Sequence, residues 1–203
     1  MDEPIAFLVR HGEDEFSDAG INVSWIDAAL TDKGRKQAED AFEILDNYDI
    51  EKIYSSPLQR TFWMAEQFAK KSGIGEFAQH RGLLPWNRGI FTGIRQETTK
   101  EVLEMFIKNP KLRIPQGESR VDCEDRLESF FVPALKEAEK STTVFFTHHS
   151  VIDVLNCLLE GKRSEEIRNL VKTGGIVAIY VDGDGYRMNA IFREDQTPEG
   201  VRS

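Results

Sequence analysis

Cationic and imidazole side chains directly follow two apolar segments of this 203-residue chain. The first segment, Ile5–Val9, is followed by Arg10 and His11, and the segment Thr143–Thr147 is followed by His148. The planar fork of an arginine side chain matches pairs of phosphate oxygens, and a neutral imidazole is a nucleophile. These residue types indicate a site that binds a phosphoryl group and attacks it with a ring nitrogen.

A third segment, Lys52–Ser55, leads into an expected helix, and Arg60 lies about one turn inside that helix. Parallel strands end at the same edge of a sheet, and ligands bind beyond that edge. Helix N-termini there would add free N–H groups and partial positive charge, which attract phosphate. Gly12 would let the backbone pass close beside the nucleophile. We therefore expect the two arginines and two histidines to converge on one phosphoryl site.

Apolar runs alternate with stretches of helical periodicity, and this order predicts an α/β sandwich with a largely parallel sheet. The expected strands are Ile5–Val9, Lys52–Ser55, Thr143–Thr147, Ile176–Val181 and Tyr186–Phe192, with a weaker candidate at Phe77–Leu83. The expected helices are one capped by Thr31, then Leu58–Lys71, Lys100–Lys108, Arg120–Glu137, Val151–Leu159 and a short one at Glu165–Val171. One domain is expected over residues 1–203, with a frayed polar tail at 194–203.

The composition limits the partners that we expect. A formal net charge of −9 disfavours nucleic acid and anionic membrane surfaces. Cys123 and Cys157 form no CxxC motif, so we expect both to be small core residues in a reducing compartment. The beginning, MDEPIAFL, lacks the features of a signal peptide, which favours a cytoplasmic location. No spacing typical of metal ligands occurs, and we expect neither metal nor cofactor.

Several segments together carry a resemblance to a known family. They are LVRHGE (Leu8–Glu13), Trp25–Ala38, YSSPLQRT (Tyr54–Thr61), Pro115–Ser119 and FFTHHSVI (Phe145–Ile152). In this order they cover most of the chain and resemble the histidine phosphatase superfamily, in the branch that includes phosphoglycerate mutases. The resemblance implies a three-layer α/β/α sandwich with a mostly parallel central sheet.

The resemblance also implies roles for particular residues. His11 would carry the phosphoryl group as a phosphohistidine, and the oxygens of that group would be held by Arg10, Arg60 and His148. The segment from Ser55 to Arg60 would form one wall of the pocket. The residues expected to contact the substrate are Gly12, Glu13, Ser17, Ser55 and His149.

The chain departs from the family pattern at the general acid. The family usually has a glutamate where alignment on Gly89 and Gly93 places Pro85, and proline cannot donate a proton. Glu13, Glu118 and Glu97 are alternative donors. The glycine that usually follows the second histidine is replaced here by His149. Ser17 takes the place of a frequent asparagine, and Asn22 lies nearby in a different register.

Three functions remain open from the sequence. The first is hydrolysis of a small phosphomonoester, and the second is a mutase that returns the phosphoryl group to another oxygen. The third, motivated by Pro85, is a weakly active or non-catalytic protein that binds phosphorylated ligands. Arg81, Arg88 and Arg95 could bind a second anionic group of the substrate. The substrate and the oligomeric state are not determined by the sequence.

Overall fold

The central sheet has six strands in the order β3-β2-β4-β1-β5-β6. The computed structural model describes residues 3–75, 77–162 and 170–192. The strands are β1 (Ala6–Arg10), β2 (Lys52–Ser55), β3 (Phe77–Gln79), β4 (Thr143–Thr147), β5 (Ile176–Asp182) and β6 (Gly185–Phe192). The first four are parallel, whereas β5 runs antiparallel to β1 and β6 antiparallel to β5. The sheet is therefore mostly parallel, as expected.

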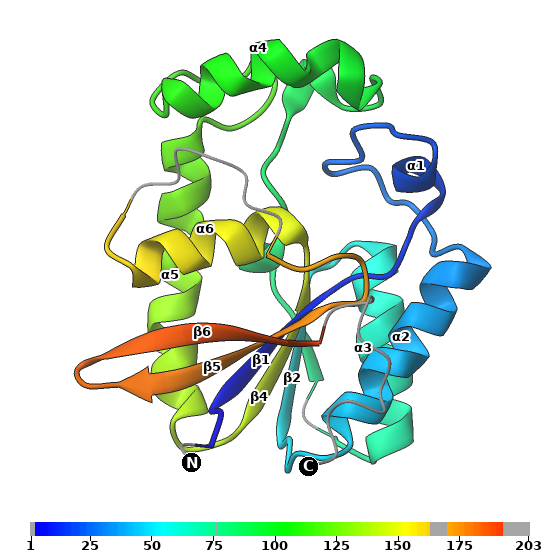
Figure 1. Ribbon diagram of the computed structural model, residues 1–203, viewed down its shortest axis with the longest axis vertical. Helices are drawn as coiled ribbons and strands as arrows, with labels where there is room; N and C mark the ends of the chain where they lie inside the picture. The colour runs from blue at the N-terminus through cyan, green and yellow to red at the C-terminus, as the bar shows by residue number, and fades with distance from the viewer. Residues whose placement is uncertain (1–2, 76, 163–169, 193–203) are drawn as a thin grey trace.

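Helices cover both faces of the sheet (Figure 1). Successive side chains of a strand point to opposite faces, so Phe7 and Val9 of β1 pack beneath α2 and α3, while Ala6 and Leu8 contact the α5 and α6 side. All four of these side chains are fully buried. The two apolar clusters make a three-layer α/β/α sandwich, which confirms the expected fold class.

The helix boundaries follow from local capping. The α-helices are α1 (Glu15–Asp18), α2 (Asp32–Leu45), α3 (Gln59–Ser72), α4 (Gln96–Lys108), α5 (Arg120–Ala138) and α6 (His149–Leu159). Thr31 accepts from Gly34 N at the start of α2, and Ser119 forms a capping box at the start of α5. Gly73, with a φ of 72°, ends α3 in the left-handed conformation.

The strand register places the expected site residues at one edge of the sheet. Arg10 at the end of β1 pairs with Thr147 at the end of β4, and Ser55 at the end of β2 pairs with Phe146. The residues that follow these strands therefore emerge at the same level. Figure 1 shows α4 at the top of the view, beyond this edge of the sheet and above α5 and α6.

Some boundaries differ from the sequence-based expectations. The weaker strand candidate is shorter than expected, because a 3₁₀ turn at Arg81–Leu83 replaces its second half. Helix α4 begins four residues earlier than expected, and α1 was not expected at all. The proposed helix Glu165–Val171 and the tail 194–203 lie largely or wholly outside the described residues, and the single-domain boundary stays a prediction. Within the described part of the chain, no helix combines the length and apolarity needed for a membrane span.

Candidate active site

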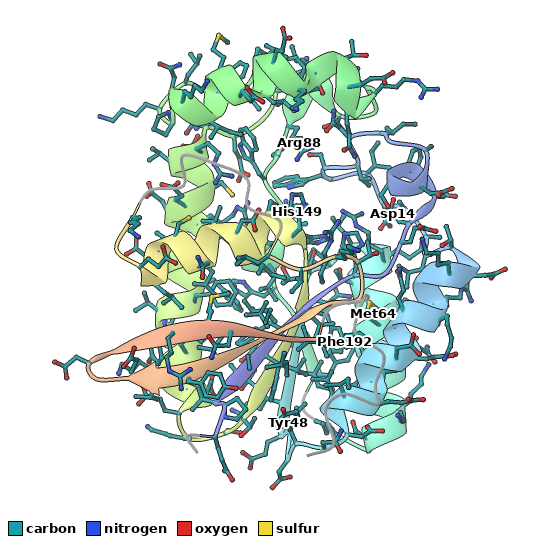
Figure 2. The ribbon with its side chains drawn as sticks, viewed as in Figure 1. Asp14, Tyr48, Met64, Arg88, His149 and Phe192 are labelled. Carbon is teal, nitrogen blue, oxygen red and sulfur yellow. The ribbon has the colours of Figure 1, made fainter. Side chains whose placement is uncertain are left out.

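A cavity of about 1000 Å³ lies beyond the carboxyl ends of β1 and β4. Its lining includes the four residues that were expected to act on a phosphoryl group: Arg10, His11, Arg60 and His148. The walls also include side chains from α1, from α4, from the start of α6 and from the segments at residues 22–24, 85–88 and 171–172. Figure 2 labels Asp14, Arg88 and His149 of this lining in the region between α4 and the end of the sheet. The structure thus brings the four residues together, although they are spread over 139 positions of the chain from Arg10 to His148.

His11 is held at the end of β1 by two hydrogen bonds, one from its backbone and one from its ring. Its backbone N–H donates to the Thr147 carbonyl at 3.0 Å, which keeps the residue in line with the strand. Its Nδ1 lies 2.7 Å from the Gly12 carbonyl oxygen. A carbonyl can only accept, so Nδ1 must carry the proton, and the neutral ring keeps its lone pair on Nε2. Only 7% of His11 is exposed, and the ring lines the cavity.

Backbone carbonyls hold the two arginines. Arg10 Nη1 donates to the Val171 carbonyl at 2.9 Å. Arg60 Nη1 and Nη2 donate to the carbonyls of Ile26 and Ser24, at 2.9 and 3.0 Å. Carbonyl oxygens orient a guanidinium without cancelling its charge. Burial lowers the pKa of Arg60 to about 10, so its guanidinium still carries a positive charge at neutral pH.

His148 faces His11 across the cavity floor. The two ring centroids are 5.1 Å apart, in an edge-on arrangement. His148 Nε2 lies 2.9 Å from Ser56 Oγ, whereas its Nδ1 is buried and has no hydrogen-bond partner among the described residues. Arg60 Nε is likewise buried and has no hydrogen-bond partner among the described residues. Buried polar atoms without a partner are costly, so both atoms favour a bound ligand that would accept from them.

Burial and positive charge keep the histidines of the site neutral in the free protein. The pKa of His11 lies well below 6.5, because of burial first and then the charges of Arg60 and Arg10. The pKa of His148 is lowered well below 6.5 by burial and by Arg60. The pKa of His149 is lowered similarly, by burial and by Arg10 among other arginines. A neutral His11 has the protonation state that a nucleophile needs.

Asp14 is a site residue that sequence analysis missed. Its side chain is fully buried, and Oδ1 caps α1 by accepting from the N–H groups of Phe16 and Ser17. Its Oδ2 lies 3.7 Å from His11 Nδ1 and 3.9 Å from Arg60 Nε, and it has no hydrogen-bond partner among the described residues. The pairing of Asp14 with Ser17 is a capping box, a short-range pattern that could have revealed α1. Nothing local could have shown that the second oxygen faces His11.

The expected substrate contacts divide into two groups. Ser17 and His149 line the cavity, whereas Gly12, Glu13 and Ser55 are not part of its lining. All five lie in or beside the three strand-end segments, but only the first two face the space where a substrate would bind. Their roles as substrate contacts stay predictions.

The three residues outside the lining have other contacts. A Cβ on Gly12 would lie 2.1 Å from the Gly34 carbonyl oxygen, so the missing side chain lets β1 approach the start of α2. The Glu13 carboxylate accepts from Lys33 at 2.8 Å, which lowers the pKa of Glu13. Ser55 Oγ donates to a neighbouring backbone carbonyl inside the protein.

The candidate proton donors differ in position. Pro85 lines the cavity but carries no ionisable group. Glu118 lies outside the lining and pairs with Arg126 at 2.9 Å. Glu97 lines the cavity from the exposed face of α4. Together with the engaged carboxylate of Glu13, these positions leave Glu97 as the one candidate of the three that faces the cavity among the described residues.

The three arginines considered for a second anionic group differ in whether they line the cavity. Arg88 lines the cavity, and its Nη1 donates to the side-chain oxygen of Asn22. The Arg81 guanidinium lies over the Trp25 ring, 5.6 Å from its centre, and Arg95 is exposed on the outside. Neither Arg81 nor Arg95 belongs to the lining.

Comparison with known proteins places the chain among phosphatases and mutases. Phosphoserine phosphatase 1 of Hydrogenobacter thermophilus is 28% identical over 162 residues, which cover 76% of this chain and 75% of that protein. A 2,3-bisphosphoglycerate-dependent phosphoglycerate mutase of Bartonella tribocorum is 27% identical over 186 residues, which cover 85% and 89% of the two chains.

Solved structures show the same fold. A mycobacterial glucosyl-3-phosphoglycerate phosphatase superposes with a TM-score of 0.77, covering 93% of this chain and 97% of that one, at 18% sequence identity. The model of the histidine phosphatase superfamily, branch 1, matches residues 6–193. That match spans every strand and helix described above, and the chain belongs to the histidine phosphatase superfamily.

Proposed function

We propose that this protein is a phosphatase that hydrolyses a small phosphomonoester through a phosphohistidine formed on His11. The observation that carries the proposal is the buried His11 ring, whose Nδ1 is hydrogen-bonded to Gly12 O within the cavity that also contains Arg10, Arg60 and His148. Membership of the histidine phosphatase superfamily and the phosphatases among the relatives support the same reaction.

In the first step, Nε2 of His11 attacks phosphorus opposite the ester oxygen. The N–P bond forms while the P–O ester bond breaks, and negative charge spreads over the three remaining oxygens. Arg10 and Arg60 offset this charge with donors that are already in place. His148 would contribute a third donor once the bound phosphoryl group draws a proton to its free Nδ1.

The charge that develops on His11 also has a partner. After attack the ring is cationic, with its Nδ1 proton still bonded to the Gly12 carbonyl. The Asp14 carboxylate, 3.7 Å from that nitrogen, favours the cationic ring. In the second step, water attacks the phosphohistidine, the N–P bond breaks, and inorganic phosphate leaves. His11 then returns to its neutral form.

Departure of the alkoxide is the demanding part of the first step, because Pro85 provides no proton. A poor leaving group needs a proton from a positioned acid, which typically contributes 10²–10⁴-fold to the rate. Without it, the protein would favour esters of acidic alcohols or act slowly on ordinary alkyl esters. Pro85 is thus the observation that favours the second candidate function, a weak catalyst that mainly binds phosphorylated ligands.

We also propose hydrolysis over mutase activity, and the cytoplasm as the compartment. The sequence offers no long insertion to close the cavity against water during transfer between two oxygens. Both cysteines are unpaired, as is usual in a reducing compartment.

The first prediction concerns the covalent intermediate. When the protein is mixed with ³²P-labelled p-nitrophenyl phosphate and quenched within milliseconds in alkaline denaturant, label should appear on His11. The activated leaving group makes the experiment independent of the missing acid, and the alkaline quench preserves the acid-labile N–P bond. His11→Asn should remove the label and lower kcat at least about 10³-fold.

A matched histidine provides the control for this trapping experiment. His80 stacks on Phe130 at 4.4 Å and lies outside the cavity lining, so His80→Asn should keep the label. Turnover by His11→Asn at the wild-type rate would refute the proposed nucleophile.

The second prediction is a loss of stability in mild acid. The folded-state pKa values of His11, His148 and His149 lie below the unfolded value of about 6.5, so the unfolded chain binds more protons below that pH. The free energy of unfolding should therefore fall as pH decreases from 6.5, by up to about 1.4 kcal/mol per pH unit for each histidine that stays neutral.

Urea unfolding between pH 7.5 and 5.5 measures this slope above the range where ordinary carboxylates titrate. The substitution His148→Gln should reduce the slope of the free energy of unfolding against pH by the contribution of one histidine. A free energy of unfolding that is constant or increases toward pH 5.5 would show that the folded protein holds these rings protonated.

The third prediction tests whether this protein is an efficient phosphatase or a weak catalyst that mainly binds phosphorylated ligands. For a series of aryl and alkyl phosphates, kcat/KM should fall steeply as the pKa of the leaving alcohol rises, because Pro85 takes the position of the family's usual general acid. Pro85→Glu should restore turnover of alkyl esters about 10²-fold or more and change p-nitrophenyl phosphate much less.

Pro85 is buried, and its carbonyl accepts from Trp25 Nε1 at 2.8 Å, a hydrogen bond that any residue at position 85 can keep. Pro85→Ala is the control for removing the ring alone. A shallow dependence on the leaving group in the wild type would mean that another side chain already donates the proton.

A further inference from the structure

A second group of basic side chains lies beside the proposed phosphoryl site, and the phosphatase reaction does not use it. Arg88 and His149 both line the cavity, and Figure 2 shows both of them below α4. Arg120, the first residue of α5, is only 2% exposed. The charges of Arg88 and Arg120 both lower the pKa of His149, so the three groups lie within electrostatic range of one another.

Arg120 has an unusual environment for a buried cation. Among the described residues its guanidinium has no hydrogen-bond or ion-pair partner, and Nε is fully buried without one. The guanidinium instead lies over the Trp86 ring, 5.1 Å from the centre. A buried charge without a partner is strongly destabilising, so it suggests a ligand that is not yet bound.

Arg88 is oriented but not neutralised. Its Nη1 donates to the neutral amide oxygen of Asn22, and Asn22 in turn donates to Thr99 Oγ1 at 2.7 Å. Burial and the charge of Arg120 lower the pKa of Arg88 to about 10. No carboxylate pairs with Arg88 among the described residues.

The carboxylates of the cavity lie elsewhere. Asp14 is beside His11 and Arg60, and Glu97 and Glu104 project from the exposed face of α4. The repulsion between Arg88 and Arg120 is therefore left for a ligand to relieve. An anion bound there would raise the pKa values of Arg88 and His149 and gain from a site whose side chains are already in position.

We propose that Arg88 and His149, with Arg120 behind them on Trp86, form a subsite for a second anionic group of the substrate. The inference rests on the proposed phosphatase function and specifies its substrate class as a small phosphomonoester that also carries a carboxylate or a second phosphate. The phosphoryl group would bind to Arg10, Arg60 and His11, and the second anion to Arg88 and His149 in the same cavity.

A series of synthetic ligands tests the subsite. Linear alkyl monophosphates of two, three and four carbons would end in a hydroxyl, a carboxylate or a second phosphate. Calorimetric titration of the His11→Asn variant, which lacks the nucleophile, should give a dissociation constant about 10-fold or more lower for an anionic than for a hydroxyl end group at one chain length or more.

Two variants assign this preference to the proposed residues. In His11→Asn/Arg88→Gln, the ratio of the dissociation constants should fall to within about 3-fold. The matched control is Arg95→Gln, which removes an exposed arginine outside the cavity lining and should keep the ratio. The carboxylate and phosphate arms distinguish which anion the subsite prefers.

Arg120→Met gives a readout that a structural role would not produce. Replacing an unpartnered buried cation by an apolar side chain should raise the urea midpoint of the ligand-free protein while it weakens the preference for anionic ligands. A lower urea midpoint with the preference intact would instead make Arg120 a packing partner of Trp86 and overturn its part in the subsite.

The outcomes separate the subsite from the phosphatase function. Wild-type hydrolysis with equal kcat/KM for hydroxyl and anionic end groups would overturn the subsite alone, as would a preference that survives Arg88→Gln. A preference in binding without phosphate release by the wild type would overturn the phosphatase function and retain the subsite. Failure of every compound to bind would overturn both.

Discussion

Hydrogen bonds from arginine side chains to backbone carbonyls are the interaction on which the rest of the site depends. Arg60 donates to the carbonyls of Ser24 and Ile26, and Arg10 to the carbonyl of Val171. These acceptors orient the buried Arg60 and the partly exposed Arg10, and a neutral carbonyl does not cancel the charge of a guanidinium. The protein as a whole carries a net charge of −9, so an anionic ligand is attracted only where such local positive charge is kept available.

The same arginines determine the protonation state of the nucleophile. Their charge and the burial of the ring lower the pKa of His11, and the Gly12 carbonyl places its proton on Nδ1. Asp14, 3.7 Å from Nδ1 of His11, balances this arrangement once the ring becomes cationic after attack. A loop contributes to the support through Ser24, whose φ of 46° is uncommon for a residue with a side chain. Its carbonyl holds Arg60 and its hydroxyl accepts from the Arg88 N–H.

The core of the fold and the identity of the converging residues could be predicted from the sequence. Apolar runs that end in charged residues identify strands and their ends, and parallel pairing brings those ends together, so Arg10, His11 and His148 were expected to meet. Short-range capping also located the start of α2 at Thr31. These predictions needed only local patterns and one rule about parallel sheets.

The remaining features depend on contacts between distant segments. The approach of Asp14 to Arg60 joins residues 46 positions apart in sequence, and the Arg88–Asn22 contact joins residues 66 apart. Glu13 was expected to face the substrate, yet its position after Gly12 directs the carboxylate to Lys33 on α2. Side-chain direction in irregular segments follows packing rather than residue type, which is why the lining by Val23 and Ser24 was not anticipated, whereas Glu97 of α4 had been named as a candidate proton donor.

A crystal structure with bound vanadate would show directly whether His11 is the nucleophile, because a trigonal vanadate mimics the phosphoryl group in transfer. We expect vanadium bound to Nε2 of His11, with its oxygens contacted by Arg10, Arg60 and Nδ1 of His148. Vanadate bound elsewhere in the cavity, or a His11 ring whose Nε2 is hydrogen-bonded to the protein instead, would contradict it.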